Sequence, residues 1–214
     1  MKTVDIPCEK VFFTSDLHFG HEWLIQFNNR PFASVEEMDQ TLIARWNQVV
    51  PADGIVFVLG DIGVTSHARI IDIFKQLQGD KILIRGNHDM EYYTQETLQS
   101  IFTEIHDLLY LRVRDFKQSI YYYLMLCHYP MIDWKSSYRG VWQLFGHIHT
   151  RQLEEFNTVK THLFAEQYDV GVDNNQFQPL SFPQLRTIIE AQQQDPLFKQ
   201  SNYYTNQQMK QWKK

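Results

Sequence analysis

One stretch, Gly86-Asn87-His88-Asp89, constrains the fold of this 214-residue chain more than any other. It follows Lys81-Ile82-Leu83-Ile84, a short apolar run with the composition of a buried strand. Glycine permits a tight turn and a close approach of the backbone to a ligand. Polar groups at the carboxyl end of a central strand lie where open α/β sheets bind their ligands. Gly, Asn and Asp are also ordinary turn residues, so the tetrad alone does not distinguish a binding site from a surface turn.

Four other strand-like runs also end in His or Asp, and together these ends favour a site. The runs are Val11–Thr14, Ile55–Leu59, Ile120–Cys127 and Val141–Phe145. The side chains at the five ends that can bind a metal are Asp16, His18, Asp61, Asn87, His128, His147 and His149. Side chains at positions i and i+2 of an extended backbone point the same way. We therefore expect Asp16 with His18, and His147 with His149, to act as pairs of ligands.

These seven nitrogen and oxygen ligands exceed what one tetrahedral zinc ion uses. They suit two ions that share a bridging carboxylate, about 3.5–4 Å apart, which can clamp the attacking and leaving oxygens of a displacement. Imidazole and carboxylate ligands favour Mn, Fe, Ni or Zn over Ca or Mg. His67, His106 and His162 lie outside the pattern, and we interpret them as surface or packing residues.

The composition indicates which classes of protein are compatible with this chain. A hydrophobic content of 43% and a charged content of 21% are ordinary for a soluble domain with a sizeable core. The formal net charge of −5 argues against a long nucleic-acid groove, which needs a basic surface. Cys8 and Cys127 form no Cys-x-x-Cys pair, so we expect a reduced, cytoplasmic protein. Neither a signal peptide nor an apolar run long enough to span a membrane is recognisable.

The order of the expected elements divides the chain into three parts. Up to the tetrad, strands alternate with helices, one opened by a capping box at Ser34 and Glu37 and one over 67–77, which indicates a parallel sheet with crossover helices. The later expected elements are a helix at 95–101, a strand at 108–113, a loop at 131–140, a strand at 167–172 and a helix at 182–193. We expect one domain over residues 1–190 and a polar, Gln- and Lys-rich C-terminal tail over residues 191–214.

The order of the polar strand ends resembles the calcineurin-like metallophosphoesterases, from Val11 to about Asp173. The matching motifs are Asp16-x-His18, Gly60-Asp61, Gly86-Asn87-His88-Asp89, His128 and Gly146-His147-x-His149. The chain is also similar to a small bacterial and phage branch of phosphoesterases, through Ser15–His21, Arg30-Pro31-Phe32, Met38-Asp39, Trp46-Asn47 and Gly171-Val172-Asp173. The resemblance implies an α/β fold, a two-sheet mixed β-sandwich flanked by helices, with the metals at one edge of the strands.

The resemblance also implies roles for the motif residues. Asp16, His18 and His149 would hold one ion. Asn87, His128 and His147 would hold the other, and Asp61 would bridge the two. A hydroxide between the ions would be the nucleophile, and His88 would be the general acid, with Asp89 orienting its ring. His21 and Arg85 flank these motifs and are candidate contacts for the phosphate of the substrate.

The connection between His128 and His147 is rich in aromatic residues that permit two interpretations. Tyr129, Trp134, Tyr138 and Trp142 either stack on a nucleobase or cover the core, and their abundance in this chain favours the core. We also assign Cys127 to the core, because it neighbours a ligand on the same strand and should face the other way.

The sequence thus predicts a metal-dependent phosphoesterase acting on a small phosphodiester or nucleotide. Two rival functions are a nuclease acting on long DNA or RNA, and a binding scaffold that has lost catalysis. The acidic net charge opposes the first, and the complete ligand set opposes the second. Whether the substrate is a monoester or a diester, and which alcohol leaves, stays open.

Overall fold

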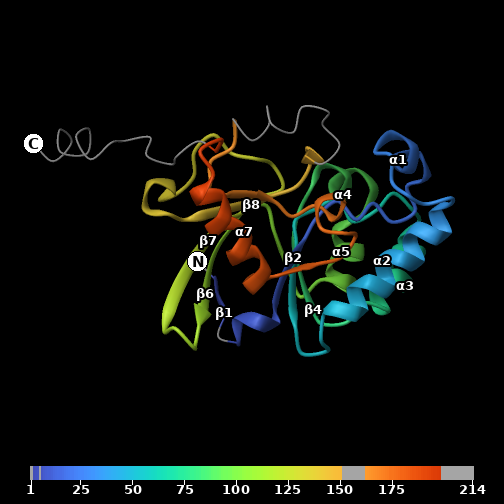
Figure 1. Ribbon diagram of the computed structural model, residues 1–214. Coiled ribbons are helices and arrows are strands. Elements are labelled where there is room, and N and C mark those ends of the chain that lie inside the picture. Colours follow the sequence, from blue (N-terminus) through green and yellow to red (C-terminus); the bar gives the residue numbers. More distant parts are fainter. Residues whose placement is uncertain (1, 5, 151–161, 199–214) are drawn as a thin grey trace, which may run out of the picture.

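The computed structural model describes residues 2–4, 6–150 and 162–198. Two five-stranded sheets pack against each other, and helices cover the outer face of one of them (Figure 1). Both sheets mix parallel and antiparallel pairs. The predicted α/β fold, a two-sheet mixed sandwich flanked by helices, is therefore confirmed.

The first sheet has the order β10-β2-β3-β4-β5. Its strands are β2 (Val11–Thr14), β3 (Ile55–Val58), β4 (Asp80–Ile84), β5 (Glu104–His106) and β10 (Leu180–Ser181). The four strands β2 to β5 are parallel, and β10 joins β2 in the antiparallel sense. This half of the molecule confirms the alternating pattern of strands and crossover helices.

The second sheet has the order β1-β6-β7-β8-β9. Its strands are β1 (Lys2–Val4), β6 (Leu109–Asp115), β7 (Ile120–Leu126), β8 (Trp142–Phe145) and β9 (Gln167–Asp169). Strands β6 and β7 form an antiparallel hairpin, whereas β7, β8 and β9 are parallel. The carboxyl ends of β7 and β8 consequently lie at one end of this sheet.

The α-helices are α1 (Glu22–Phe27), α2 (Val35–Val49), α3 (His67–Lys75), α4 (Asn87–Tyr92), α5 (Gln95–Ile101) and α7 (Phe182–Gln194). Short 3-10 turns are η1 (Cys8–Lys10), η2 (Ser137–Arg139) and η4 (Val172–Asn174). Helices α2, α3 and α5 lie on the outer side of the first sheet (Figure 1). Helix α2 begins as expected, since the Ser34 hydroxyl accepts the backbone N–H of Glu37.

The first sheet separates two hydrophobic clusters because its side chains alternate between its faces. Phe12 and Val56 point toward the helices. Phe13 and Phe57 point toward the second sheet, where their rings stack with centroids 5.6 Å apart, and they share this inner cluster with Leu124 of β7. Helix α7 closes the inner cluster with Phe182, Leu185 and Ile189. Both faces of β2 and β3 are thus buried, as their apolar runs predict.

The sequence patterns miss five short elements, namely β1, α1, α4, β5 and β10. The omission of α4 matters most, because Asn87, His88 and Asp89 form its first turn rather than a surface turn. The predicted boundary at residue 190 falls inside α7, which continues to Gln194, and residues 199–214 of the predicted tail lie outside the described residues. The division into domain and tail stays a prediction.

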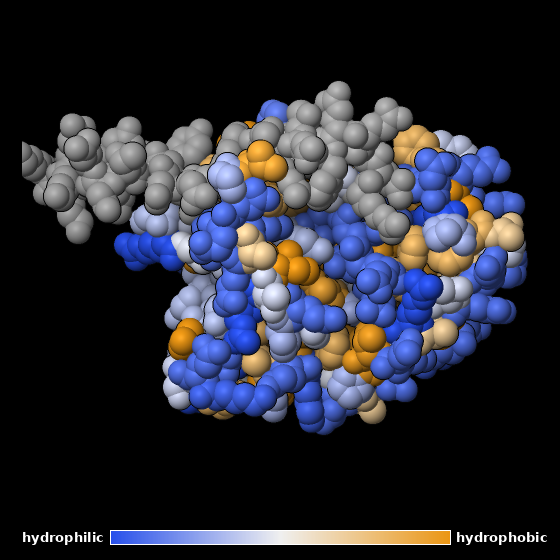
Figure 2. Space-filling model, viewed as in Figure 1, coloured by the Kyte–Doolittle hydropathy of each residue, from blue (hydrophilic) through white to orange (hydrophobic). Residues whose placement is uncertain are grey.

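Apolar residues on the face in Figure 2 appear in small groups among hydrophilic ones. Within the described residues, no helix has the length and apolar character that crossing a membrane requires. Cys8 is buried and Cys127 is half-buried, so the assignment of Cys127 to the core is only partly right.

Candidate metal centre

The predicted ligands lie where the carboxyl ends of the two sheets meet. Loops leaving β2 and β3 are joined by a hydrogen bond from the Asp16 N–H to the Gly60 carbonyl. In the second sheet, the Gly146 N–H donates to the His128 carbonyl. The backbone N–H of His147 donates to both oxygens of Asp16 at 3.1 Å, which connects the two sheets at the site.

The backbone at the ligands is not extended, contrary to the expectation for the Asp-x-His and His-x-His pairs. The φ angles are 55° at Asp16, 51° at His18, 71° at His147 and 44° at His149. These values lie in the left-handed region, which non-glycine residues seldom adopt. Asp61 shares this conformation, with φ of 55°. The side chains converge through this unusual backbone rather than through the alternation of a strand.

Three overlapping groups of side chains have their ligand atoms within 4.8 Å of one another. They are Asp16 with His18 and His149, His18 with Asp61 and His88, and Asp61 with His128 and His147. Asp61 belongs to two groups, and its Oδ2 lies 3.6 Å from His18 Nε2 and 3.5 Å from His128 Nε2. Asn87 adjoins them, with its Oδ1 3.2 Å from His128 Nε2. The structure therefore brings all seven predicted ligands together.

Two of the imidazoles are oriented by acceptors on their far side. His128 Nδ1 donates to the Leu59 carbonyl at 2.6 Å. His149 Nδ1 lies 2.8 Å from an oxygen of Asp173. A carbonyl oxygen only accepts, so Nδ1 carries the proton in the neutral His128 ring and Nε2 presents its lone pair to the site. His149 Nδ1 also lies 2.8 Å from the side-chain nitrogen of Asn28.

The charges of the site fit a bound cation. Burial raises the pKa of Asp16 to about 6. Burial also disfavours ionised Asp61, but the adjacent His128 outweighs it and lowers the pKa of Asp61. Burial would lower the pKa of His128, yet its contacts with Asp61 and Asp16 raise it to about 9. The two buried carboxylates are therefore stabilised in their ionised form by a neighbouring positive charge. A divalent ion bound between them would provide that charge.

One buried nitrogen supports the same conclusion. His18 Nε2 is buried and has no hydrogen-bond partner among the described residues. Burial lowers the pKa of His18 well below its ordinary value, so the ring is neutral and Nε2 is available as a ligand. An unsatisfied buried polar atom is costly unless a ligand completes it. The donor set is thus suited to divalent transition metals.

Gly86 and Gly146 permit the loops to approach one another this closely. A Cβ atom at Gly86 would collide with the Asp61 carboxylate. A Cβ atom at Gly146 would collide with the side chains of Ser15 and Asp16. Gly86 has an extended φ of −98°, so close approach, and not a left-handed turn, explains the glycine of the tetrad.

The role predicted for Asp89 needs correction. Its carboxylate accepts three backbone N–H groups, from Asp61, Ile62 and Gly86, at 2.8–3.1 Å. No hydrogen bond from Asp89 to the His88 ring occurs in the described part of the chain. The ring instead has Nδ1 3.5 Å from the exposed carboxylate of Glu91 and Nε2 4.0 Å from Asp61 Oδ2. Asp89 therefore positions the Asp61 loop.

A buried ion pair behind His149 has no assigned role in the sequence analysis. The Arg30 guanidinium donates two hydrogen bonds of 2.9 Å to the Asp173 carboxylate, which also holds His149. Arg30 further donates to the carbonyls of Asp16 and Leu17. The signal was present, because both residues belong to the motifs shared with the phage branch. No local sequence pattern predicts that Arg30 and Asp173 form a pair, since 143 positions separate them.

The two candidate phosphate contacts lie in different surroundings. His21 is next to the site, with its Nδ1 3.2 Å from His18 Nδ1. Arg85 forms two hydrogen bonds of 2.8 Å with Asp107, so its guanidinium already has a carboxylate partner. His67 and His106 lie outside the site, as expected, and bond to Thr97 and Glu104 respectively.

The four aromatic residues of the connection divide equally between core and surface. Trp134 and Trp142 are buried, which agrees with the core interpretation. Tyr129 and Tyr138 are exposed, contrary to it. The Tyr129 ring lies against His147, with centroids 4.8 Å apart, and so borders the site.

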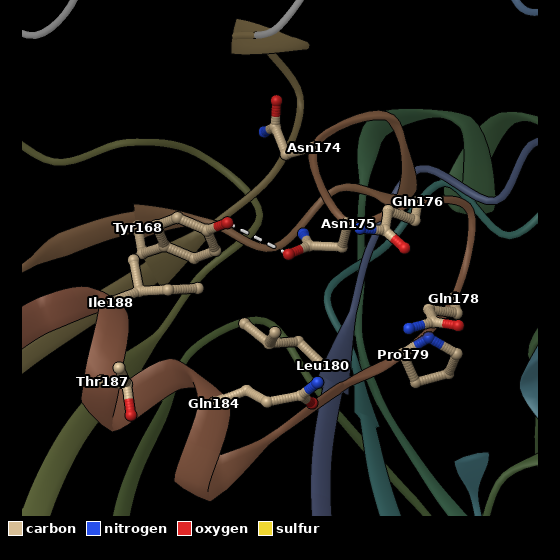
Figure 3. A pocket seen from close by; sticks show the side chains of 10 residues that line it. All are labelled: Tyr168, Asn174, Asn175, Gln176, Gln178, Pro179, Leu180, Gln184, Thr187 and Ile188. Carbon is tan, nitrogen blue, oxygen red and sulfur yellow. Dashed lines mark hydrogen bonds between the residues drawn. The ribbon is translucent and has the colours of Figure 1, made fainter.

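A hollow of about 380 Å³ lies elsewhere, between η4, β10 and α7. Tyr168 donates a 3.0 Å hydrogen bond to Asn175 across it (Figure 3). Its lining is mainly amide and aliphatic, and it includes none of the candidate ligands. We therefore do not assign the chemistry of the protein to this hollow.

Buried carboxylates and imidazoles at the junction of two mixed sheets define a metal-dependent hydrolase. A family model described as calcineurin-like phosphoesterase matches residues 9–163. The chain belongs to the calcineurin-like phosphoesterases and is a metal-dependent phosphoester hydrolase. This membership confirms the predicted family and opposes the interpretation as a scaffold without catalysis.

The chain is also similar to individual proteins over most of its length. An uncharacterized protein of Methanocaldococcus jannaschii is 31% identical over 85% of this chain and 92% of its own length. The gene 66 protein of Mycobacterium phage L5 is 27% identical over 76% of this chain and 86% of its own. A crystal structure of a protein of unknown function from Aquifex aeolicus shares the fold, with a TM-score of 0.64 and 23% identity over 83% of this chain and 98% of that one.

Proposed function

We propose that the protein hydrolyses a small phosphodiester or a nucleotide with the aid of two divalent transition-metal ions, manganese foremost. The observation that supports this proposal is the set of overlapping ligand groups, two of which contain Asp61. Asp16, His18 and His149 would hold one ion, and Asn87, His128 and His147 the other. Asp61 lies between imidazoles of both sets, as a bridging carboxylate must.

The protein's own residues would orient the substrate and supply a proton. When bound, the ions would activate water and offset the negative charge of the phosphate. His88 is partly exposed beside His18, with ring centroids 5.4 Å apart, so it can reach a leaving oxygen at the mouth of the site. There His88 would act as a general acid and protonate the leaving oxygen. Arg30 and Asp173 would fix the ring of His149 from behind.

A metal-reconstitution assay tests this proposal. Protein stripped with a chelator is reloaded separately with Mn, Ni and Zn. It is then assayed on p-nitrophenyl phosphate, bis-p-nitrophenyl phosphate, a set of cyclic and linear nucleotides, and long DNA and RNA. We expect about two ions per chain and metal-dependent turnover of a small ester or nucleotide. Faster turnover of long DNA or RNA than of any small ester would favour the rival nuclease, and one ion per chain would refute the dinuclear site.

A further inference from the structure

Helix α1 exposes two large aromatic side chains close to the metal centre. Trp23 is 61% exposed and Phe27 is 64% exposed, while Leu24 and Ile25 of the same helix are buried. Trp23 and Phe27 are four positions apart, so they occupy one face of the helix. Their rings are stacked, with centroids 4.4 Å apart and planes inclined by 21°. They therefore form an exposed, stacked aromatic pair with ring surface still open to solvent, which we call the α1 platform.

The α1 platform is continuous with the candidate ligands through a single ring. His21, the residue before α1, lies 5.2 Å from the His18 ring and 6.1 Å from the Trp23 ring. The His21 and Trp23 planes are inclined by only 28°, which is a stacked arrangement. His88 also lies 6.1 Å from His21. A molecule with its phosphate at the metal centre can thus extend past His21 onto Trp23.

We propose that the α1 platform binds a nucleobase of the substrate by stacking. This inference rests on the proposed function, because it supposes that the phosphoester belongs to a nucleotide. In a nucleotide a sugar separates the phosphate from a flat aromatic base, and here His21 separates the candidate ligand His18 from the exposed aromatic pair. Stacking accepts every base, since each has a π face. The α1 platform therefore selects nucleotides over other phosphoesters without reading a sequence.

The position of the α1 platform explains its exposure better than packing does. Large aromatic side chains gain free energy when buried, yet these two remain exposed on a helix whose other apolar residues are buried. Hydrophobic residues reach the surface over α1, at the upper right of Figure 2. Among the aromatic residues of the His128 connection, for which the sequence favoured the core over base stacking, Tyr129 borders the site through its contact with His147.

Binding of two matched products tests the α1 platform without requiring turnover. Thymidine 5′-monophosphate and 2-deoxyribose 5-phosphate carry the same phosphate, and only the first carries a base. We expect the metal-loaded protein to bind the nucleotide more tightly by titration calorimetry. Trp23→Ala should raise the Kd for the nucleotide about tenfold and leave the Kd for the sugar phosphate unchanged. Trp23→Phe should restore most of the affinity.

A matched control is Phe116→Ala, which removes an exposed aromatic ring from the far turn between β6 and β7 and should change neither Kd. The proposal is overturned if the wild-type protein binds both products equally, or if Trp23→Ala weakens both equally. It is also overturned if Trp23→Ala converts a dimer into a monomer on gel filtration, which would make this face an interface between copies. A protein that cleaves neither a diester nor a nucleotide but keeps the expected Kd pattern would refute the proposed function and not the α1 platform.

Discussion

Five of the seven candidate ligands hold a left-handed backbone, and this is the main structural feature at the scale of single residues. They are Asp16, His18, Asp61, His147 and His149. An L-residue in this conformation loses about 1–2 kcal/mol relative to its usual one. Such strain persists only where the surrounding structure enforces it, and it gathers at functional sites. Here the rest of the fold holds the ligands in positions that the local sequence disfavours.

The strain at His147 can be measured because this residue is exposed and has a φ of 71°. We expect the His147→Gly variant to have a higher free energy of unfolding than the His147→Ala variant, by up to about 1.5 kcal/mol. Relief of about 1–2 kcal/mol of strain outweighs the extra chain entropy of glycine, about 0.5–1 kcal/mol. Urea unfolding of chelator-treated protein provides the measurement.

The same pair of substitutions at Gln40, an exposed position within α2, is the control. Glycine there should be less stable than alanine by about 1 kcal/mol, because the backbone is helical. If glycine were less stable than alanine at position 147 as well as at position 40, the backbone of His147 would not be left-handed in solution.

His88 offers a second prediction at this scale, which separates proton donation from metal binding. His88→Asn should retain both ions and lose activity mainly on esters with poor leaving groups. An alkoxide needs a proton to depart, whereas p-nitrophenolate leaves largely unaided, and general acids contribute about 10²–10⁴-fold. Turnover of a nucleotide ester should therefore fall at least about tenfold more than turnover of a p-nitrophenyl ester. Equal losses on both esters, or loss of metal, would remove His88 from the role of acid.

At the scale of elements, local patterns predict the long helices and the apolar strands, and they fail for short elements without such a pattern. Helix α2 carries a capping-box signature and apolar residues at helical spacing, and it begins after Ser34, as the sequence predicts. Strand β10 has two residues and β5 has three, so their pairing with neighbouring strands, and not their own sequence, determines them. Helix α4 is likewise fixed by Asp89, whose carboxylate accepts N–H groups of a distant loop.

The same distinction holds for the candidate site. The convergence of the candidate ligands was predictable because each follows a recognisable strand. Their left-handed backbone was not, since it arises where loops of two sheets are forced together around Gly86 and Gly146. The Arg30 and Asp173 pair was not predictable either, because contacts over such a separation depend on the whole fold.

The Trp46-Asn47 motif joins neighbouring elements, because it attaches α2 to the connection between α3 and β4. Asn47 donates to the Gln76 carbonyl at 2.8 Å and accepts the Gln78 N–H at 2.9 Å. We expect Asn47→Ala to lower the free energy of unfolding by about 1–2 kcal/mol, at about 1 kcal/mol for each net hydrogen bond. Metal content and turnover should stay at wild-type levels, which urea unfolding and an assay would establish. A loss of metal at unchanged stability would instead link this motif to the site.

At the scale of the whole molecule, the candidate ligands come from both sheets. Asp16, His18, Asp61 and Asn87 follow strands of the first sheet, and His128, His147 and His149 follow strands of the second. An ion held by ligands of both sheets binds only when the sheets are packed together. Metal binding should therefore stabilise the packing of the sandwich as well as create its chemistry.

This coupling predicts a large and graded response to metal. An ion present at 100 times its Kd stabilises the folded state by about 2.7 kcal/mol. Two such ions should raise the Tm of a chain of this size by about 10–20 °C over chelator-treated protein, at about 2–4 °C per kcal/mol. His149→Ala removes a ligand of one ion and should keep roughly half of this increase. Asp61→Asn weakens the carboxylate shared by both ions and should abolish most of it. Thermal unfolding with and without Mn, together with metal analysis of each variant, would measure how much of the rise in Tm each variant keeps. An undiminished rise in Tm for Asp61→Asn would show that Asp61 does not bridge the two ions.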